Sequence, residues 1–283
     1  MRHHPFIGHL LACAGGAGVD NIFRQVVAVA LATLAVQRLG PGQAAEDLGA
    51  QWTQWALVLF MLPFVLLAPL AGGLGERLPK HRIVRWCRLA DLPVCVLAVA
   101  GFALHSVPLM LLGLVLLGIT SAVFAPVKLA IVPELVDESR LATANGRLNA
   151  VTVVAILGGM GIGAATDPVV AQWLQTHAGL ALDLHLISTL VLALLAVVAC
   201  AVGLSGAWLV PALSAADANA PLVRPWQFAR MATALNGTPG LWAPCLALCA
   251  FWALGAVATT GMVPLAKNVY GFDQAGVAAL ALA

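Results

Sequence analysis

Charged residues are scarce in this chain, at 9% of its 283 residues, whereas a soluble domain usually carries about a quarter. Hydrophobic residues make up 61%, and the mean hydropathy is +0.96. So few charges cannot cover a surface that faces water, so most of the surface must face lipid. The net charge of +2 gives no indication of a nucleic-acid partner. The composition excludes a soluble enzyme domain and predicts an all-α integral membrane protein.

The chain also lacks the residue spacing of a disulfide framework or a metal site. Its six cysteines form no CxxC pair, and a thiol inside an apolar segment behaves as a small hydrophobe. None of its seven histidines is paired with a carboxylate at ligand spacing. We therefore predict no cofactor, no metal and no catalytic residue.

Long apolar runs are abundant, and a membrane-spanning helix needs about 20 such residues. The candidate spans are Gly8–Val36, Trp55–Leu74, Ile83–Leu104, Val107–Leu129, Leu148–Ala165, Leu184–Val210 and Leu241–Pro264. An eighth begins near Ala275 and continues to Ala283 without a polar stop, so we expect a truncated chain. The first run is too long for a signal peptide and is expected to be retained.

Lysine and arginine indicate the orientation, because cytoplasmic loops carry an excess of both. With the N-terminus inside, the outer loops hold only Arg38 and Lys267, and Arg24 lies within the first run. The inner loops and flanks hold Arg2, Arg77, Lys80, Arg82, Arg85, Arg88, Lys128, Arg140, Arg147, Arg224 and Arg230. We predict a multi-pass protein with a cytoplasmic N-terminus.

The spacing of the runs predicts three parts. Residues 1–210 form an N-terminal six-helix half, and 211–240, which contain SAADANAP, form a cytoplasmic loop between halves. Residues 241–283 hold the first two helices of an incomplete C-terminal half. The short outer turn at His105 and Ser106 is the expected junction between two three-helix units, although no repeat is visible in the sequence.

The segment between the second and third runs reads GGLGERLPKHR over residues 72–82. It resembles the loop motif of major facilitator proteins, with Glu in place of Asp and Pro in place of a Gly. A small residue such as Gly73 lets helix ends approach closely. The acid Glu76 and the basic residues can form a bridge that holds one of two bundle arrangements. The candidate gating residues of this loop are Gly73, Glu76, Arg77, Lys80 and Arg82; the alternative is an ordinary cationic loop.

Polar side chains interrupt the first run near its midpoint, where a charge costs at least about 2.5–3.5 kcal/mol. Asp20 and Arg24 are four residues apart, so they share a helix face and can neutralise each other. Alternatively, this patch lines a central cavity, where Arg24 meets a phosphate while Asp20 and Asn21 orient a polar head group. Both interpretations can hold together.

Three more charged residues are candidates. Asp91 lies in the third run and either pairs with Arg88 or Arg24 or lines the cavity. Lys128 and Glu134 flank the end of the fourth run and are further candidate gating residues; Lys128 is otherwise an interfacial anchor beside acids or a substrate contact. The fifth run contains Gly158, Gly159, Gly161 and Gly163, and small residues of this kind predict close packing against a neighbouring helix.

Several segments resemble the bacterial lysophospholipid transporters of the major facilitator type. These are AGVDNIF at 17–23, FAPVKLAIVPE at 124–134, LATANG at 141–146 and AILG at 155–158. The similarity covers nearly all of residues 8–165. The departures are Val19, where an aromatic residue or Asn is usual, Leu129 in place of Tyr, and Glu76 in place of Asp.

The resemblance implies an alternating-access transporter in the bacterial inner membrane. It would move lysophospholipid to the cytoplasmic leaflet for re-acylation, with membrane lipid around it and an acyltransferase as a candidate partner. Two alternatives stay open: a proton-coupled exporter of small amphipathic compounds, or the membrane part of a bifunctional acyltransferase. No histidine here begins an H-x4-D pair, so we expect any fused acyltransferase beyond residue 283.

Overall fold

The computed structural model describes residues 4–164, 173, 175–177, 183–220, 222, 233, 237, 240–247, 249–250 and 253–254. The chain divides into two compact units, residues 1–226 and 227–283. The first contains α1 (His4–Leu39), α2 (Gln43–Arg77), α3 (Lys80–Ala103), α4 (Val107–Ala130), α5 (Val132–Leu135), the 3-10 turn η1 (Glu138–Arg140), α6 (Leu141–Ala164) and α8 (Leu184–Leu209). In the second, residues 242–247 are helical.

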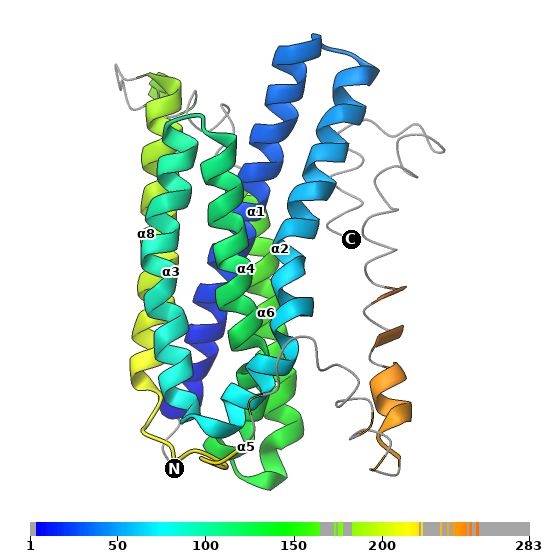
Figure 1. The fold of residues 1–283 in the computed structure, drawn as a ribbon. Coiled ribbons are helices and arrows are strands. Elements are labelled where there is room, and N and C mark those ends of the chain that lie inside the picture. The colour runs from blue at the N-terminus through cyan, green and yellow to red at the C-terminus, as the bar shows by residue number, and fades with distance from the viewer. Residues whose placement is uncertain are drawn as a thin grey trace. The chain divides into compact units, whose positions relative to one another are not determined.

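The predicted all-helical bundle is confirmed for the described residues, and several helices extend beyond their predicted apolar runs, such as α6, which begins at Leu141 rather than at Leu148 (Figure 1). The second helix begins at Gln43 rather than at Trp55, because the helix continues past its apolar stretch to the turn at Gly40, whose φ is 77°. Only part of the predicted seventh span, and none of the eighth, lies within the described residues.

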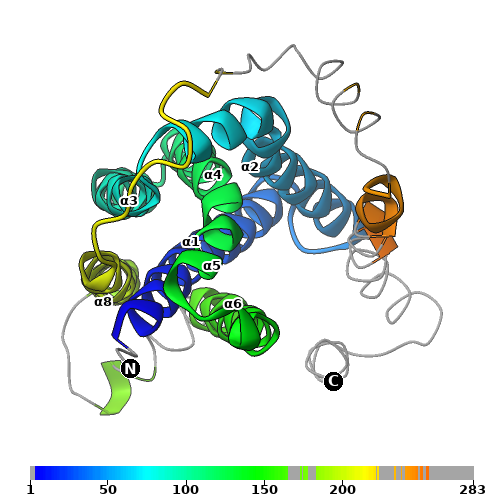
Figure 2. The same ribbon diagram turned by 90° about the horizontal axis from the view of Figure 1, so that it is seen from below.

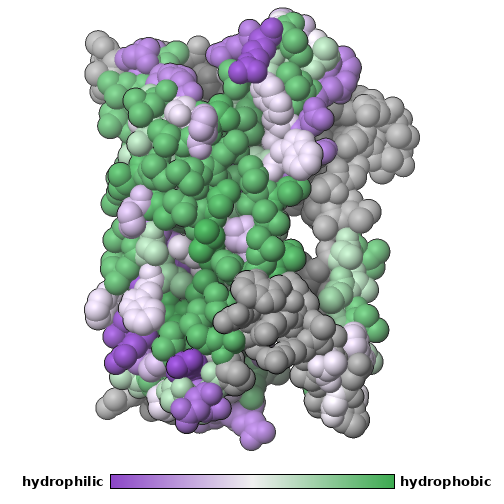
Figure 3. Space-filling view, viewed as in Figure 1, coloured by the Kyte–Doolittle hydropathy of each residue, from purple (hydrophilic) through white to green (hydrophobic). Residues whose placement is uncertain are grey.

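Five helical segments within the described residues are long and apolar enough to cross a membrane: α1, α2, α4, the η1–α6 segment and α8. The segment left out is α3, whose first half carries Lys80, Arg82, Arg85, Arg88 and Asp91. In Figure 3 the visible described surface is hydrophobic across its middle and hydrophilic at both ends. That distribution is expected when the middle of a bundle contacts hydrocarbon.

The six long helices of the first unit pair in a reciprocal pattern. In chain order they form two triplets, one of α1, α2 and α3 and the other of α4, α6 and α8. The first helix of each triplet packs mainly on the other triplet: α1 packs on α6 and α8, and α4 packs on α2 and α3. Seen from below, α1 crosses the middle of the bundle, with α6 on one side and α4 and α8 on the other (Figure 2). Successive triplets start from opposite ends of the bundle, and this part of the packing is what two inverted three-helix repeats would give.

Glycines permit the close approach of α1 to its neighbours. A Cβ on Gly159 of α6 would lie 2.8 Å from the carbonyl oxygen of Gly18, and one on Gly163 would lie 2.6 Å from that of Ile22. A Cβ on Gly158 or Gly161 would meet nothing within 4 Å. The close packing predicted from the four glycines between 158 and 163 is thus made by two of them, spaced one turn apart.

These contacts predict different effects for two adjacent substitutions. Gly159→Ala should lower the free energy of unfolding by about 1–3 kcal/mol, because the added methyl group must push α6 away from α1. Gly158→Ala gains the same helix propensity without a steric clash, so its free energy of unfolding should equal or exceed that of the parent protein. The measurement is the fraction of monodisperse protein that survives heating in detergent; equal survival of both variants would contradict the packing argument.

Candidate functional site

The polar residues in the middle of the first unit come from three helices. Residues of α1, α3 and α4 contact one another through side-chain hydrogen bonds and one ion pair. This central polar cluster consists of Asp20, Asn21, Arg24, Arg88, Asp91, Thr120 and Ser121. It brings together all four residues that the sequence proposes for substrate binding: Asp20, Asn21, Arg24 and Asp91.

Within the cluster, Asp20 and Arg24 do not form the ion pair that their spacing allows. Instead, a carboxylate oxygen of Asp20 accepts a hydrogen bond of 2.5 Å from the Ser121 hydroxyl on α4. The guanidinium of Arg24 donates to the side-chain oxygen of Asn21 at 3.1 Å and lies 5.3 Å from the ring centre of Phe60 on α2. Among the described residues, ion pairs join only Lys80 to Glu134 and Arg88 to Asp91. Within the described part of the chain, no carboxylate lies within ion-pair distance of the Arg24 guanidinium.

The sequence names Arg88 only as a possible partner of Asp91, yet it is the most deeply buried charge in the cluster. Its residue exposure is 2%, and its guanidinium lies 3.1 Å from a carboxylate oxygen of Asp91 and 4.8 Å from the ring centre of Phe124. A Cβ on Gly16 of α1 would collide with this guanidinium. The sequence groups Arg88 with the positive charges of the predicted inner loops and flanks. Its burial depends on space left by Gly16, which is far away in the chain, so the local sequence does not reveal it.

Asp91 has two partners. Besides Arg88, it accepts a hydrogen bond of 3.0 Å from the Thr120 hydroxyl of α4. Thr120 and Ser121 are adjacent, so α4 contacts Asp91 with one hydroxyl and Asp20 with the next. The cluster is therefore continuous from α3 through α4 to α1.

The candidate gating residues lie at the end of the bundle where α2 ends and α3 begins. The ion pair there joins Lys80, in the first turn of α3, to Glu134 of α5. Lys80 is buried, while the side chains of Glu76, Arg77 and Arg82 are exposed. The loop motif alone would suggest an ion pair between Glu76 and a basic residue of the same loop. Among the described residues, the ion pair instead joins two helices, α3 and α5. Gly73 is half-buried in the last turns of α2.

Lys128 contributes its backbone carbonyl, and not its side chain, to the contacts at this end of the bundle. Its carbonyl is among the last four of α4, which have no partner within their own helix. The buried imidazole of His9 on α1 donates to this oxygen at 2.8 Å. This contact ties the end of α4 to the start of α1, whereas the Lys128 side chain makes no ion pair within the described residues.

The segment after α8 crosses the same end of the bundle. The backbone N–H of Leu213 donates to the ring Nδ1 of His81 at 2.9 Å, and that of Asp217 donates to the carbonyl of Glu76 at 3.1 Å. Arg85 also donates to the carbonyl of Val210 at 2.9 Å. The start of the predicted inter-half loop is therefore bound to the α2–α3 junction.

These features define a class of multi-pass membrane proteins. Its members are helix bundles in which two helix triplets start from opposite ends, with paired charges at the centre and a basic junction between the second and third helices. The chain belongs to the Major Facilitator Superfamily, which it matches over residues 13–283. The family predicted from the α2–α3 loop is confirmed.

The curated relatives include proteins named "Lysophospholipid transporter LplT". The one from Photorhabdus laumondii is 36% identical over 113 residues, which are 40% of this chain and 27% of the relative. The one from Escherichia coli O1:K1 is 29% identical over 198 residues, which are 68% of this chain and 42% of the relative. The predicted resemblance is confirmed, and the chain spans less than half the length of these relatives.

The Arg88–Asp91 pair predicts a stability pattern. Arg88→Met should lower the free energy of unfolding by about 3–5 kcal/mol, because it leaves the Asp91 carboxylate buried without a counter-charge. Arg88→Met combined with Asp91→Leu should recover most of this loss, since Thr120 keeps its bond to the carbonyl of Leu117. Thermal unfolding in detergent checks both, and a double variant no more stable than Arg88→Met would refute the pairing.

Proposed function

We propose that this chain is the N-terminal part of a transporter that moves lysophospholipid across the bacterial inner membrane toward the cytoplasmic leaflet by alternating access. The observation that carries the proposal is Arg24, a half-buried guanidinium at the middle of α1 held by an amide and an aromatic ring instead of a carboxylate. The names of the curated relatives support the choice of substrate.

The chemistry of the cluster suits a phosphate head group. A guanidinium presents donors in a planar fork that matches phosphate oxygens, and its charge lacks a carboxylate partner in the described part of the chain. Asn21 and Asp20, one turn away, would orient the rest of the head group. The acyl chain would contact apolar helix faces. Arg88 is unsuited to this role because Asp91 already neutralises it.

The ion pair at the α2–α3 junction supplies a gate. We assign residues 1–210 to the N-terminal half with its N-terminus cytoplasmic, 211–240 to the loop between halves and 241–283 to the start of the second half. The Lys80–Glu134 pair then lies at the cytoplasmic face, where it holds one arrangement of the bundle. An acyltransferase on that side would consume the transported lysophospholipid.

Arg24→Gln tests the binding site. The variant keeps a donor for Asn21 but removes the charge, so uptake of labelled lysophospholipid should fall about ten-fold or more at normal membrane abundance. Arg38→Gln is a matched control, since Arg38 also lies 5.3 Å from the ring centre of an aromatic residue of α2, Trp52, but at the end of α1. Asp20→Asn should also reduce uptake, and full uptake in both Arg24→Gln and Asp20→Asn would refute the site.

A proton-coupled exporter is the second candidate, favoured by the Asp20 carboxylate, which accepts its hydrogen bond from the uncharged hydroxyl of Ser121. The same uptake assay separates the two functions. Lysophospholipid uptake that continues after the proton gradient collapses would count against the exporter. Gradient-dependent efflux of small amphipathic compounds, without lysophospholipid uptake, would replace our proposal.

Exchanging the charges tests the gate. Lys80→Glu and Glu134→Lys should each reduce uptake, because each places like charges together at the α3–α5 contact. The double variant restores opposite charges and should recover uptake. Arg140→Glu is the control, because Arg140 is an exposed residue of η1, shortly after Glu134 in the chain. Uptake by the double variant as low as that of the single variants would show that the pair does not act as a gate.

A further inference from the structure

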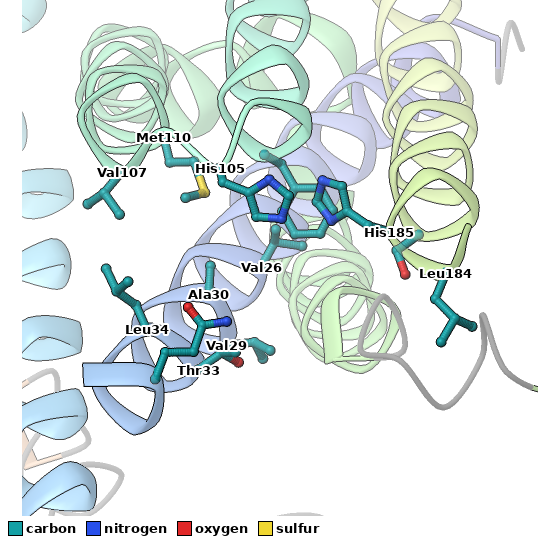
Figure 4. A pocket seen from close by; sticks show the side chains of 13 residues that line it. Val26, Val29, Ala30, Thr33, Leu34, His105, Val107, Met110, Leu184 and His185 are labelled. Atoms are coloured by element: carbon teal, nitrogen blue, oxygen red, sulfur yellow. The ribbon is translucent and has the colours of Figure 1, made fainter. Parts of the chain in front are cut away.

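A cavity of about 320 Å³ lies at the end of the bundle opposite the N-terminus (Figure 4). The second half of α1, the α3–α4 turn and the first turns of α4 and α8 form its walls. The apolar lining includes Val26, Ala30, Leu34, Val107, Met110 and Leu184. Its α1 wall runs from residue 26 to residue 37, about 16 Å along the helix axis. The cavity is therefore elongated and mostly apolar.

Two histidines stand out among the polar residues of the lining. The rings of His105 and His185 stack with their centres 3.8 Å apart and their planes at 27°, as the view in Figure 4 shows. The Nε2 of His185 donates to the carbonyl oxygen of Ala103 at 3.2 Å, so this ring is fixed by the turn. No hydrogen bond to the His105 ring is found among the described residues. His105 therefore offers a nitrogen to an occupant of the cavity.

The rest of the lining favours an acceptor-rich head group. Thr33, Gln37 and Ser188 add hydroxyl and amide groups, and the described residues of the lining include no Asp, Glu, Lys or Arg. An anionic group thus meets hydrogen-bond donors and no carboxylate. The volume lies at the lower end of the about 300–1,000 Å³ typical of ligand sites, which suits one acyl chain and not two.

We propose that this cavity is a docking site for a single-chain amphiphile, with its head group at His105 and its chain along α1. The inference rests on the proposed function, which places this end of the bundle at the outer leaflet and makes a lysophospholipid the occupant. Val26, at the inner end of the cavity, follows Arg24 by two residues. The site would hold the substrate before it reaches the central polar cluster.

Photolabelling tests the site in the whole protein in native membranes. Lysophosphatidylethanolamine with a diazirine on its acyl chain should label peptides that line the cavity. Ala30→Phe fills the cavity and should abolish this labelling, whereas Val36→Phe places the same ring on an exposed residue of the same helix that does not line it. Unchanged labelling in Ala30→Phe, or equal labelling by a diacyl probe or a free fatty acid, would overturn the proposal.

A second pair of variants tests the head-group contact. His105 has a φ of 51°, a left-handed conformation that Gly and Asn both tolerate. His105→Gly removes the ring and should weaken labelling about ten-fold, while His105→Asn retains a donor and should lose less. Equal losses in the two variants would overturn the assigned head-group contact.

The test separates this site from the proposed function. Arg24→Gln should lose uptake and keep the label, whereas Ala30→Phe should raise the lysophospholipid concentration needed for half-maximal uptake. Normal uptake in Ala30→Phe would show that the cavity holds a bystander lipid. Absence of uptake in the parent protein would refute the proposed function and leave the labelling result standing.

Discussion

Arg88 carries a permanent positive charge at 2% exposure, and the packing around α3 follows from the need to neutralise it. Asp91 supplies the opposite charge one turn later, and Phe124 of α4 places its ring beside the guanidinium. Gly16 of α1 and Gly203 of α8 leave the space that the side chain occupies. A side chain at either glycine would force the helices apart, so this one cation links four helices.

The register of the other polar residues follows from that pair. Because Asp91 also accepts a hydrogen bond from Thr120, the position of α4 along α3 is set, and the next hydroxyl, that of Ser121, meets Asp20 of α1. Asp20 is thereby turned toward α4, while Arg24, on the same helix, extends toward Asn21 and Phe60. The i,i+4 spacing permitted an ion pair within α1, but the contacts between helices are the ones that form.

Local features of the sequence predicted the helices well, because the length and hydropathy of a run are properties of consecutive residues. They predicted the polar patch at Asp20 and Arg24 for the same reason, since charges within an apolar run are visible without any partner. The sequence did not predict which residues contact one another across helices. Lys80 and Glu134 are 54 residues apart, and the choice of Gly159 and Gly163 over Gly158 and Gly161 depends on which face meets α1. Such contacts require the relative rotation of helices, which a single sequence does not display.

The helices α3 and α4 connect the proposed gate to the central polar cluster. Lys80 and Asp91 are eleven residues apart on one continuous helix, about 16 Å along its axis, and Pro93 follows them. On α4, Ser121 precedes Pro126, after which His9 and Glu134 tie the end of the helix and α5 to α1 and α3. Pro93 removes the backbone hydrogen bond to the carbonyl of Leu89, so α3 is weakened in the turn that contains Asp91. Asp91 in turn contacts Thr120 of α4, next to the Ser121 hydroxyl that meets Asp20. The Lys80–Glu134 ion pair at one end of the bundle and the central polar cluster are thus connected by contacts that lie on α1, α3, α4 and α5.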